Sequence, residues 1–114
     1  MGRRRARTLI TLVFLAAATA MPAGAQQAGG AREFTVTMDN MVFGRVPTGA
    51  KVGDTIIWVN NDTVQHTATA RDASFDVRLQ PGKQGRTVLS KAGSVAVYCI
   101  YHPMMRTTLR VAAS

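Results

Sequence analysis

Cysteine, histidine and aromatic residues are scarce in this chain of 114 residues. The single cysteine, Cys99, excludes an internal disulfide and any site that needs two thiolates, such as a four-cysteine zinc site or an iron–sulfur cluster. Aromatic residues make up 6% of the sequence, too few for a surface on which nucleic-acid bases stack. The remaining composition, 46% hydrophobic and 18% charged residues, is typical of one packed globular domain.

The N-terminal segment has the residue order of a secretory signal peptide. Four arginines in the first seven positions precede an apolar run at 9–20, and small residues follow up to Ala25. The run is shorter than the roughly 20 residues that a membrane-spanning helix needs. We therefore predict a cleaved signal peptide at 1–25, a flexible mature N-terminus at 26–32 and one domain at 33–114, exported to the periplasm by either the Sec or the twin-arginine route.

The charge of the predicted domain is moderate and dispersed. The chain carries 14 Lys and Arg against 6 Asp and Glu, but the ten Lys and Arg that follow residue 25 stand singly. No run of them could follow a phosphate backbone, so we expect no nucleic-acid partner. Two interpretations stay open for these charges, namely solvated strand faces and turns, or a surface that attracts an acidic partner.

Short runs of alternating or β-branched residues predict an all-β domain. Phe34, Val36 and Met38 alternate with polar residues, and 55–60 is a β-branched run. Further strands are expected at 41–43, 65–70, 84–90, 94–99 and 107–112, and none is assigned to 71–80. Seven or eight short strands, with turns about every 8–12 residues, predict an antiparallel two-sheet β-sandwich.

Four residues together have the chemistry of a metal site. Cys99 is followed by His102 and Met105, and His66 is the other histidine of the chain. One thiolate, two imidazoles and a thioether are the ligand set of a trigonal copper site with a long axial methionine. Zinc prefers four strong ligands, so copper fits better. Each residue alone is an ordinary core residue, but their combination predicts that His66, Cys99, His102 and Met105 bind copper.

The spacing of these residues predicts how the site is built. Cys99 ends a predicted strand, and the loop through Met105 must curl around one ion before the chain re-enters the sheet at 107. His66 must then arrive from a neighbouring strand, held by the fold rather than by local sequence. Of the two adjacent methionines, Met105 is the expected axial ligand, and Met104 is expected to form apolar surface beside His102.

The motif Cys99-x-x-His102-x-x-Met105 resembles the copper loop of the cupredoxins, the type 1 blue copper proteins, and is most similar to the short loop of amicyanin among the plastocyanin-like members. The likeness extends upstream to 41–43 and 51–60. It implies a Greek-key β-sandwich with one copper ion near one end.

The resemblance also assigns His66, Cys99, His102 and Met105 as the copper ligands. One position differs, because Thr67 stands where the family commonly has an asparagine that tethers the copper loop. Its hydroxyl is expected to donate a hydrogen bond to the backbone near Cys99. The redox potential therefore does not follow from the resemblance.

The resulting hypothesis is a periplasmic one-electron carrier without a substrate-transforming site of its own. His102 is the expected electron port, with Pro103 and Met104 in an apolar docking rim. Its expected partners are a redox donor and acceptor, such as a dehydrogenase and a c-type cytochrome, and the expected state is a monomer. The alternative is copper storage, delivery or resistance with the same ligands. An oxidase or nitrite reductase is not expected, since two histidines cannot supply a second, catalytic copper centre.

Overall fold

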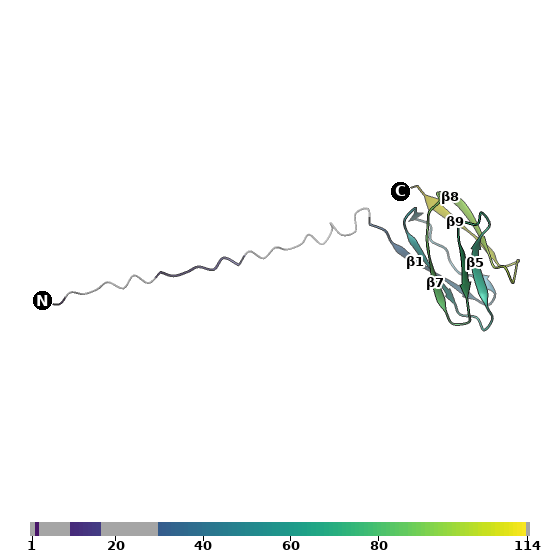
Figure 1. Cartoon of the computed structure of the whole chain (residues 1–114), viewed down its shortest axis with the longest axis horizontal. Helices are drawn as coiled ribbons and strands as arrows, with labels where there is room; N and C mark the ends of the chain where they lie inside the picture. The colour runs from purple at the N-terminus through teal and green to yellow at the C-terminus, as the bar shows by residue number, and fades with distance from the viewer. Residues whose placement is uncertain (1, 3–9, 17–29, 114) are drawn as a thin grey trace.

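Nine β-strands form the domain in the computed structural model, which describes residues 2, 10–16 and 30–113 (Figure 1). The strands are β1 (Glu33–Asp39), β2 (Val42–Phe43), β3 (Ala50–Lys51), β4 (Thr55–Asn60), β5 (His66–Ala70), β6 (Asp76–Leu79), β7 (Gln84–Val88), β8 (Gly93–Tyr98) and β9 (Arg106–Ala112). The predicted signal peptide at 1–25 lies outside the described residues, except for residue 2 and 10–16. Among the described residues, no helix is long and apolar enough to cross a membrane.

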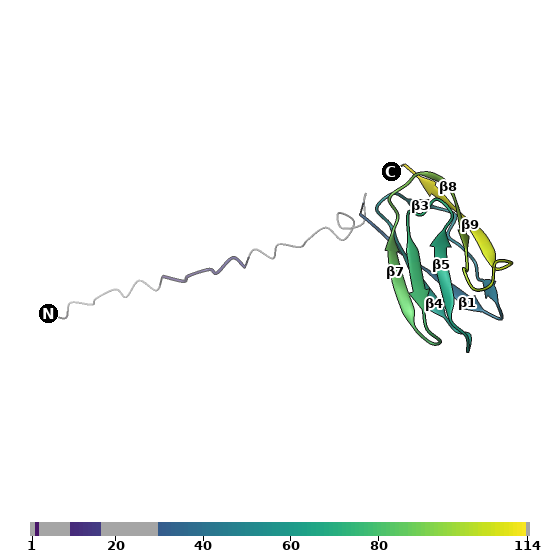
Figure 2. The same cartoon turned by 45° about the vertical axis from the view of Figure 1, so that its right-hand side comes forward.

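The strands form two sheets that face each other, as the all-β expectation requires (Figure 2). The four-stranded sheet has the order β2-β1-β4-β7, and the five-stranded sheet has the order β3-β9-β8-β5-β6. The predicted two-sheet β-sandwich is confirmed, and most of its strand pairs are antiparallel. Two pairs, β1 with β4 and β3 with β9, are parallel, and the antiparallel prediction is wrong for these. The reason is the path of the chain. After the β1–β2 hairpin it passes through β3 in the other sheet, and it returns in β4 with the direction of β1.

The long predicted strands are confirmed, and two short ones were not predicted. The run at 55–60 is β4, and the expected strand at 84–90 ends two residues early, at Val88. The unpredicted strands are β3, with two residues, and β6, with four. Such short segments contain at most two alternations of apolar and polar residues, so only their pairing with β9 and β5 identifies them as strands.

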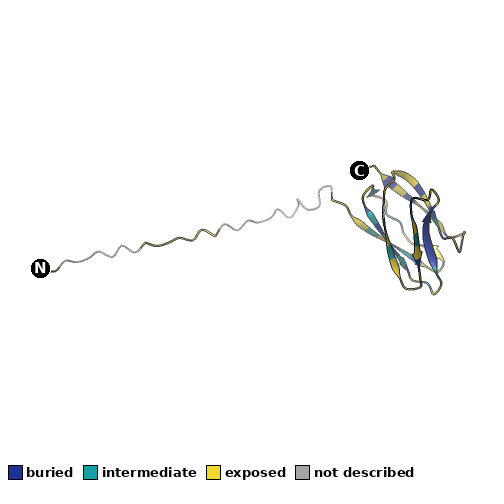
Figure 3. Cartoon of the chain, in the orientation of Figure 1, coloured by how far each residue is buried: buried dark blue, intermediate teal, exposed yellow. Residues whose placement is uncertain are grey.

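The core lies between the sheets and is formed by the inward-facing residues of both (Figure 3). Trp58 of β4 is fully buried, packs against the rings of Phe43 and Phe75, and donates its indole N–H to the Thr87 hydroxyl at 3.1 Å. The other fully buried apolar side chains come from both sheets: Val36, Met38, Ile56, Ala68, Val97, Cys99 and Leu109. Cys99 therefore belongs to the core as well as to the candidate site.

One side of the sandwich is closed where β6 and β7 approach, although they belong to different sheets. Gly85 permits this approach, because a Cβ atom there would lie 2.5 Å from Cγ1 of Val77. Between β6 and β8, all five residues of β5 are buried. The first of them is His66, so the fold holds one predicted ligand on its most buried strand.

Candidate metal centre

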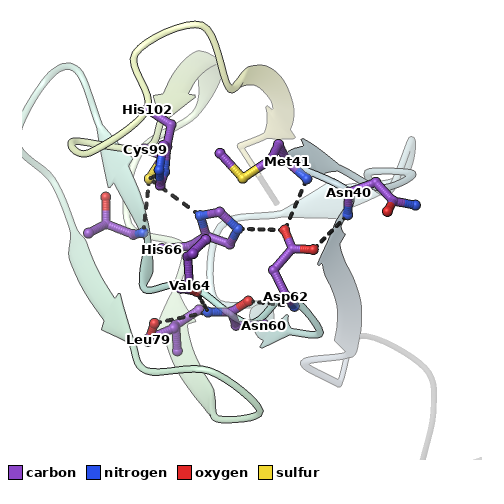
Figure 4. Close-up of polar contacts among 10 residues, drawn as sticks. Asn40, Met41, Asn60, Asp62, Val64, His66, Leu79, Cys99 and His102 are labelled. Carbon is purple, nitrogen blue, oxygen red and sulfur yellow. Dashed lines mark hydrogen bonds and ion pairs between the residues drawn. The ribbon is translucent and has the colours of Figure 1, made fainter.

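Three of the four predicted ligands lie together at one end of the sandwich (Figure 4). The Sγ atom of Cys99 is 3.8 Å from Nδ1 of His66 and 3.6 Å from Nδ1 of His102. The two imidazole rings meet edge to face, with centroids 5.2 Å apart. His66 and Cys99 are fully buried, whereas His102 is half-buried. The site is therefore closed on the side of the core and open toward solvent at His102.

The loop between Cys99 and Met105 is a tight turn closed by its own backbone. The amide of Cys99 donates to the carbonyl of Met105 at 3.0 Å, and the amide of Met105 donates to the carbonyl of His102 at 2.8 Å. Met105 is 4% exposed and packs in the core, whereas Met104 is 86% exposed. Met104 therefore lies on the surface, as expected, whereas Met105 packs in the core at the end of the loop.

The Thr67 hydroxyl contacts the loop after Cys99, but it accepts a hydrogen bond there rather than donating one. The Thr67 hydroxyl oxygen accepts a hydrogen bond from the backbone N–H of Ile100 at 2.9 Å, so the expectation that it donates to this backbone is wrong. An amide nitrogen can only donate, which leaves the hydroxyl oxygen as the acceptor. The backbone N–H of Thr67 lies 3.4 Å from Sγ of Cys99 and donates to it. A thiolate accepting this bond gains stabilisation from it.

The Thr67 hydroxyl belongs to a chain of hydrogen bonds that returns to the loop. Its oxygen lies 2.9 Å from that of Thr69, and Thr69 donates to the Asp76 carboxylate at 2.8 Å. Because the Thr69 proton is used there, the Thr67 proton is free to donate to Thr69. Asp76 also binds Arg78 at 3.2 Å, and Arg78 donates to the Tyr101 hydroxyl at 3.2 Å. This series of hydrogen bonds thus links β5 and β6 to Ile100 and Tyr101 of the loop.

Asp62 orients the imidazole of His66. One carboxylate oxygen of Asp62 lies 2.6 Å from Nε2 of His66, and the carboxylate also accepts the backbone N–H groups of Asn40 at 2.7 Å and Met41 at 2.9 Å. The hydrogen bond from His66, together with that from the Met41 amide, lowers the pKa of Asp62 below 3.8. An ionised carboxylate only accepts, so Nε2 carries the proton and the lone pair of Nδ1 faces Cys99.

The residues that form hydrogen bonds with Asp62 are themselves held in place. Asn40 and Met41 form the two-residue turn between β1 and β2, and both have positive φ angles, 53° and 63°. Positive φ is unusual for methionine, and the two bonds to Asp62 stabilise this turn. The buried Asn60 side chain donates to the carbonyls of Val64 and Leu79 and accepts the amide of Asp62, so it shapes the loop before His66.

Sequence reasoning missed the roles of Asn60, Asp62 and Thr69. The residue types at 60–62, Asn-Asn-Asp, are those of a turn and do not by themselves point to a metal site. The spacing of Asp62, four residues before the candidate ligand His66, was an available signal. No sequence signal pointed to Thr69, because its partner Asp76 becomes adjacent only through the pairing of β5 with β6.

Two of the three separations between ligand atoms match those expected around a single ion. Bond lengths of about 2.0 Å to nitrogen and 2.3 Å to sulfur, typical of zinc, place the N and S ligand atoms of a three-coordinate ion about 3.7 Å apart. The two Sγ–Nδ1 separations, 3.8 Å and 3.6 Å, match this value, and the third pair lies within 4.8 Å. One thiolate and two imidazoles with a buried thioether close by are soft ligands that suit copper.

Comparisons with known proteins support this chemistry. No family model matches the chain. The methylamine utilization protein MauL of Methylorubrum extorquens is 34% identical over 108 residues, which cover 91% of this chain and 90% of that protein. A structure of an oxidised amicyanin variant is 25% identical, covers 76% of this chain and 87% of that one, and has a TM-score of 0.62. A reduced amicyanin variant, 21% identical over 69% of this chain and 81% of that one, also gives 0.62.

The relative spans almost the whole chain, the fold agrees with that of solved amicyanins, and the soft ligand cluster lies at the end of the sandwich where the resemblance implied it. The chain therefore belongs to the cupredoxin family, the type 1 copper proteins that carry single electrons, and it is amicyanin-like.

Proposed function

We propose that His66, Cys99, His102 and Met105 bind one copper ion and that the protein passes single electrons between periplasmic redox partners. The observation that carries this proposal is the convergence on Sγ of Cys99 of Nδ1 of His66, at 3.8 Å, and Nδ1 of His102, at 3.6 Å. Met105 is buried in the same short loop and is the one thioether that this loop holds against the core. Copper, when bound, supplies the one-electron change between its +1 and +2 states.

The chain's own residues keep the ligands in one arrangement. Asp62 holds His66 from the side opposite the ion, and the turn from Cys99 to Met105 is closed by two backbone hydrogen bonds. The metal therefore does not have to create the site, and little of the protein has to move when the oxidation state changes. Rigid ligands favour fast electron transfer because they limit reorganisation.

His102 is the proposed electron port because it is the ligand that reaches solvent. The loops at this end of the sandwich carry exposed apolar side chains, and the most exposed of them is Met104 at 86%. The other exposed apolar residues of these loops are Met41, Val64, Ile100, Tyr101 and Pro103. A small apolar rim of this kind suits brief encounters with redox proteins. We propose that Pro103 and Met104 belong to this rim.

The partners follow from the similarity to a protein of methylamine utilization. We propose a methylamine-oxidising dehydrogenase as the electron donor and a c-type cytochrome as the acceptor. The expected signal peptide places the mature chain, residues 26–114, in the periplasm, with 33–114 as its one folded domain and a monomer as its state. Purified dehydrogenase that leaves the copper(II) form oxidised in the presence of methylamine would refute the donor assignment.

The protein has no substrate-transforming site of its own under this proposal. Both histidines of the chain lie in the one cluster, and the single cysteine lies between them. A second, catalytic copper centre would need further imidazoles, which this sequence does not have. Oxidation of a substrate therefore takes place in a partner.

The visible spectrum of the mature protein during titration with Cu(II) tests the proposal. An intense thiolate-to-copper band is expected at one equivalent, absent in Cys99→Ala, altered in Met105→Ala and unchanged in the matched control Met104→Ala. Voltammetry of the blue form should then give a reversible one-electron wave. A colourless protein that retains Cu(I) would overturn the carrier assignment and favour copper storage or delivery.

A further inference from the structure

The outer face of the five-stranded sheet gathers arginines that are far apart in the sequence. On β8 and β9 buried and exposed residues alternate, so Tyr98 and Arg106, which pair across the two strands, point away from the core. Arg110 pairs with Ser94 on the same face, and Arg78 of β6 pairs with Thr67. Arg71, just after β5, lies over the ring of Tyr98, with its guanidinium carbon 4.3 Å from the centroid.

The positive charge of this face is largely uncompensated. We define the arginine face as the outer surface formed by Arg71, Arg78, Arg106 and Arg110 around Tyr98; Asp76 is the acidic residue on its strands. Asp76 pairs with Arg78 at 3.2 Å. Within the part of the chain that the structure describes, the other three arginines form no ion pair.

The outer face of the four-stranded sheet has the opposite balance. Its charged residues on β1 and β7 are Glu33, Asp39 and Arg86, and Arg86 forms an ion pair with Glu33. Exposed threonines and partly exposed residues of β4 fill the rest of that face. Counted over strand residues alone, the two outer faces therefore differ in the sign of their net charge. Beside Arg71, which follows β5, the exposed Asp72 is paired with Lys91 at 3.8 Å. The difference in net charge between the faces favours the second interpretation of the charges, a surface that attracts an acidic partner.

The arginine face adjoins the metal centre. Tyr98 is bonded to Cys99 along the chain, and it pairs with Thr69 of the hydrogen-bonded chain that supports the copper loop. Arg78 donates to Tyr101, which lies between Cys99 and His102. A protein seated on this face would thus contact residues directly beside the thiolate, and it would meet the apolar rim of His102 at Tyr101.

We propose that the arginine face is a second docking surface, which binds an acidic redox protein while His102 and its apolar rim serve another partner. The proposal rests on the carrier function above, because a carrier must meet both a donor and an acceptor. Guanidinium groups bind carboxylates through paired N–H donors, so acidic side chains are the chemistry that these four positions recognise. Such charges mainly raise the rate of encounter and orient the partner, and salt weakens them.

The test uses a poly-glutamate peptide as the acidic probe, in the metal-free and Cu(I) forms of the mature protein. Amide NMR shifts report where the peptide binds, at low salt and at about 0.15 M salt. The variant Arg71→Gln/Arg106→Gln/Arg110→Gln removes three charges from the face. A matched control, Arg45→Gln/Lys83→Gln/Arg86→Gln, removes three exposed positive charges from other parts of the surface. It therefore has the same net charge as the arginine-face variant.

We expect peptide-induced shifts on β5, β6, β8 and β9, at least a tenfold weaker affinity in the arginine-face variant, and less than about a twofold change in the control. Equal weakening in both variants would show that only net charge matters and would overturn the proposal. Tighter, arginine-dependent binding to phosphatidylglycerol vesicles than to the peptide would overturn it in favour of a lipid surface. The blue band tests the carrier assignment separately, so the two proposals fail by different measurements.

Discussion

Two aspartates flank β4 at opposite ends of the sandwich, and they have similar tasks. Asp54 precedes the strand and accepts the backbone N–H groups of Arg32 at 2.8 Å and Lys51 at 2.9 Å. Asp62 follows the strand and accepts the N–H groups of Asn40 and Met41. Each carboxylate thus ties a neighbouring loop to β4. At each, these backbone bonds contribute to a pKa below 3.8.

Asp62 and Asp54 differ in one side-chain partner. Asp62 also holds Nε2 of His66 at 2.6 Å, whereas Asp54 binds backbone groups and lies 3.9 Å from the Arg32 guanidinium. A carboxylate that organises loops becomes part of a metal centre when an imidazole is placed within its reach. One end of the molecule is therefore structural, and the other uses the same kind of contact to orient a ligand.

The largest expected effect distinguishes His66, which Asp62 holds, from His102, which lies on the loop between Cys99 and Met105. His66→Gly and His102→Gly should each abolish the blue band. Added imidazole should restore the band in the His102 variant, because that position reaches solvent, but not in the His66 variant, whose side chain is fully enclosed. Visible spectra during an imidazole titration give the answer. Equal rescue of both variants would contradict the enclosed position of His66.

The second prediction compares the two aspartates directly. Asp62→Ala and Asp54→Ala should both lower the unfolding temperature of the metal-free protein, because backbone N–H groups lose their acceptor at each site. The first should lower it by about 5 °C or more, because the fully buried imidazole of His66 loses its acceptor as well. Only Asp62→Ala should also weaken Cu(I) binding, about tenfold, since a histidine that loses its carboxylate partner binds metal less well. Thermal melts and a competing Cu(I) chelator measure the two effects. Asp39→Ala, at the exposed end of β1, is the control.

The third prediction concerns acid. The pKa of Asp54 is lowered in the folded state, chiefly by the amides of Arg32 and Lys51. Its contribution to stability is therefore present above pH 3.8 and is lost as the pH falls below 3.8, through the lowered folded value. Denaturant titrations of the metal-free protein should show that Asp54→Asn destabilises it at pH 6 but that the gap from the wild type narrows in acid. A gap that stays constant with pH would refute this assignment.

The smallest expected effect is at Thr67, on the loop side of the centre. Thr67→Val removes the acceptor of the Ile100 amide and should lower stability by about 1 kcal/mol, while Thr67→Ser should change it little. The amide of Thr67 still donates to Cys99 in both variants, so the blue band should persist. Copper release to a chelator should be faster only in the valine variant. Identical release from all three proteins would show that the hydroxyl does not hold the loop.

Local patterns predicted the long strands and most of the candidate site because their signals lie within a few residues of each other. The run at 55–60 is β4, and in the motif from Cys99 to Met105 the structure places Cys99 and His102 together with His66. The strand β6 escaped prediction because four residues carry too weak a pattern. The contact of the Thr67 hydroxyl with the backbone beside Cys99 was expected, but its donor sense was wrong, because the fold places the amide of Ile100 there and an amide N–H can only donate.

The sequence by itself determined the all-β class, the soft ligand set and the compact loop that carries three of its four members. Only the tertiary structure decided the parallel pairing of β1 with β4, the contact of Asp62 with His66 and the gathering of Arg71, Arg78, Arg106 and Arg110 on one face. The physical reason is range. Periodicity and ligand chemistry are properties of neighbouring residues, whereas hydrogen bonds and surface charge depend on which distant strands the fold places side by side.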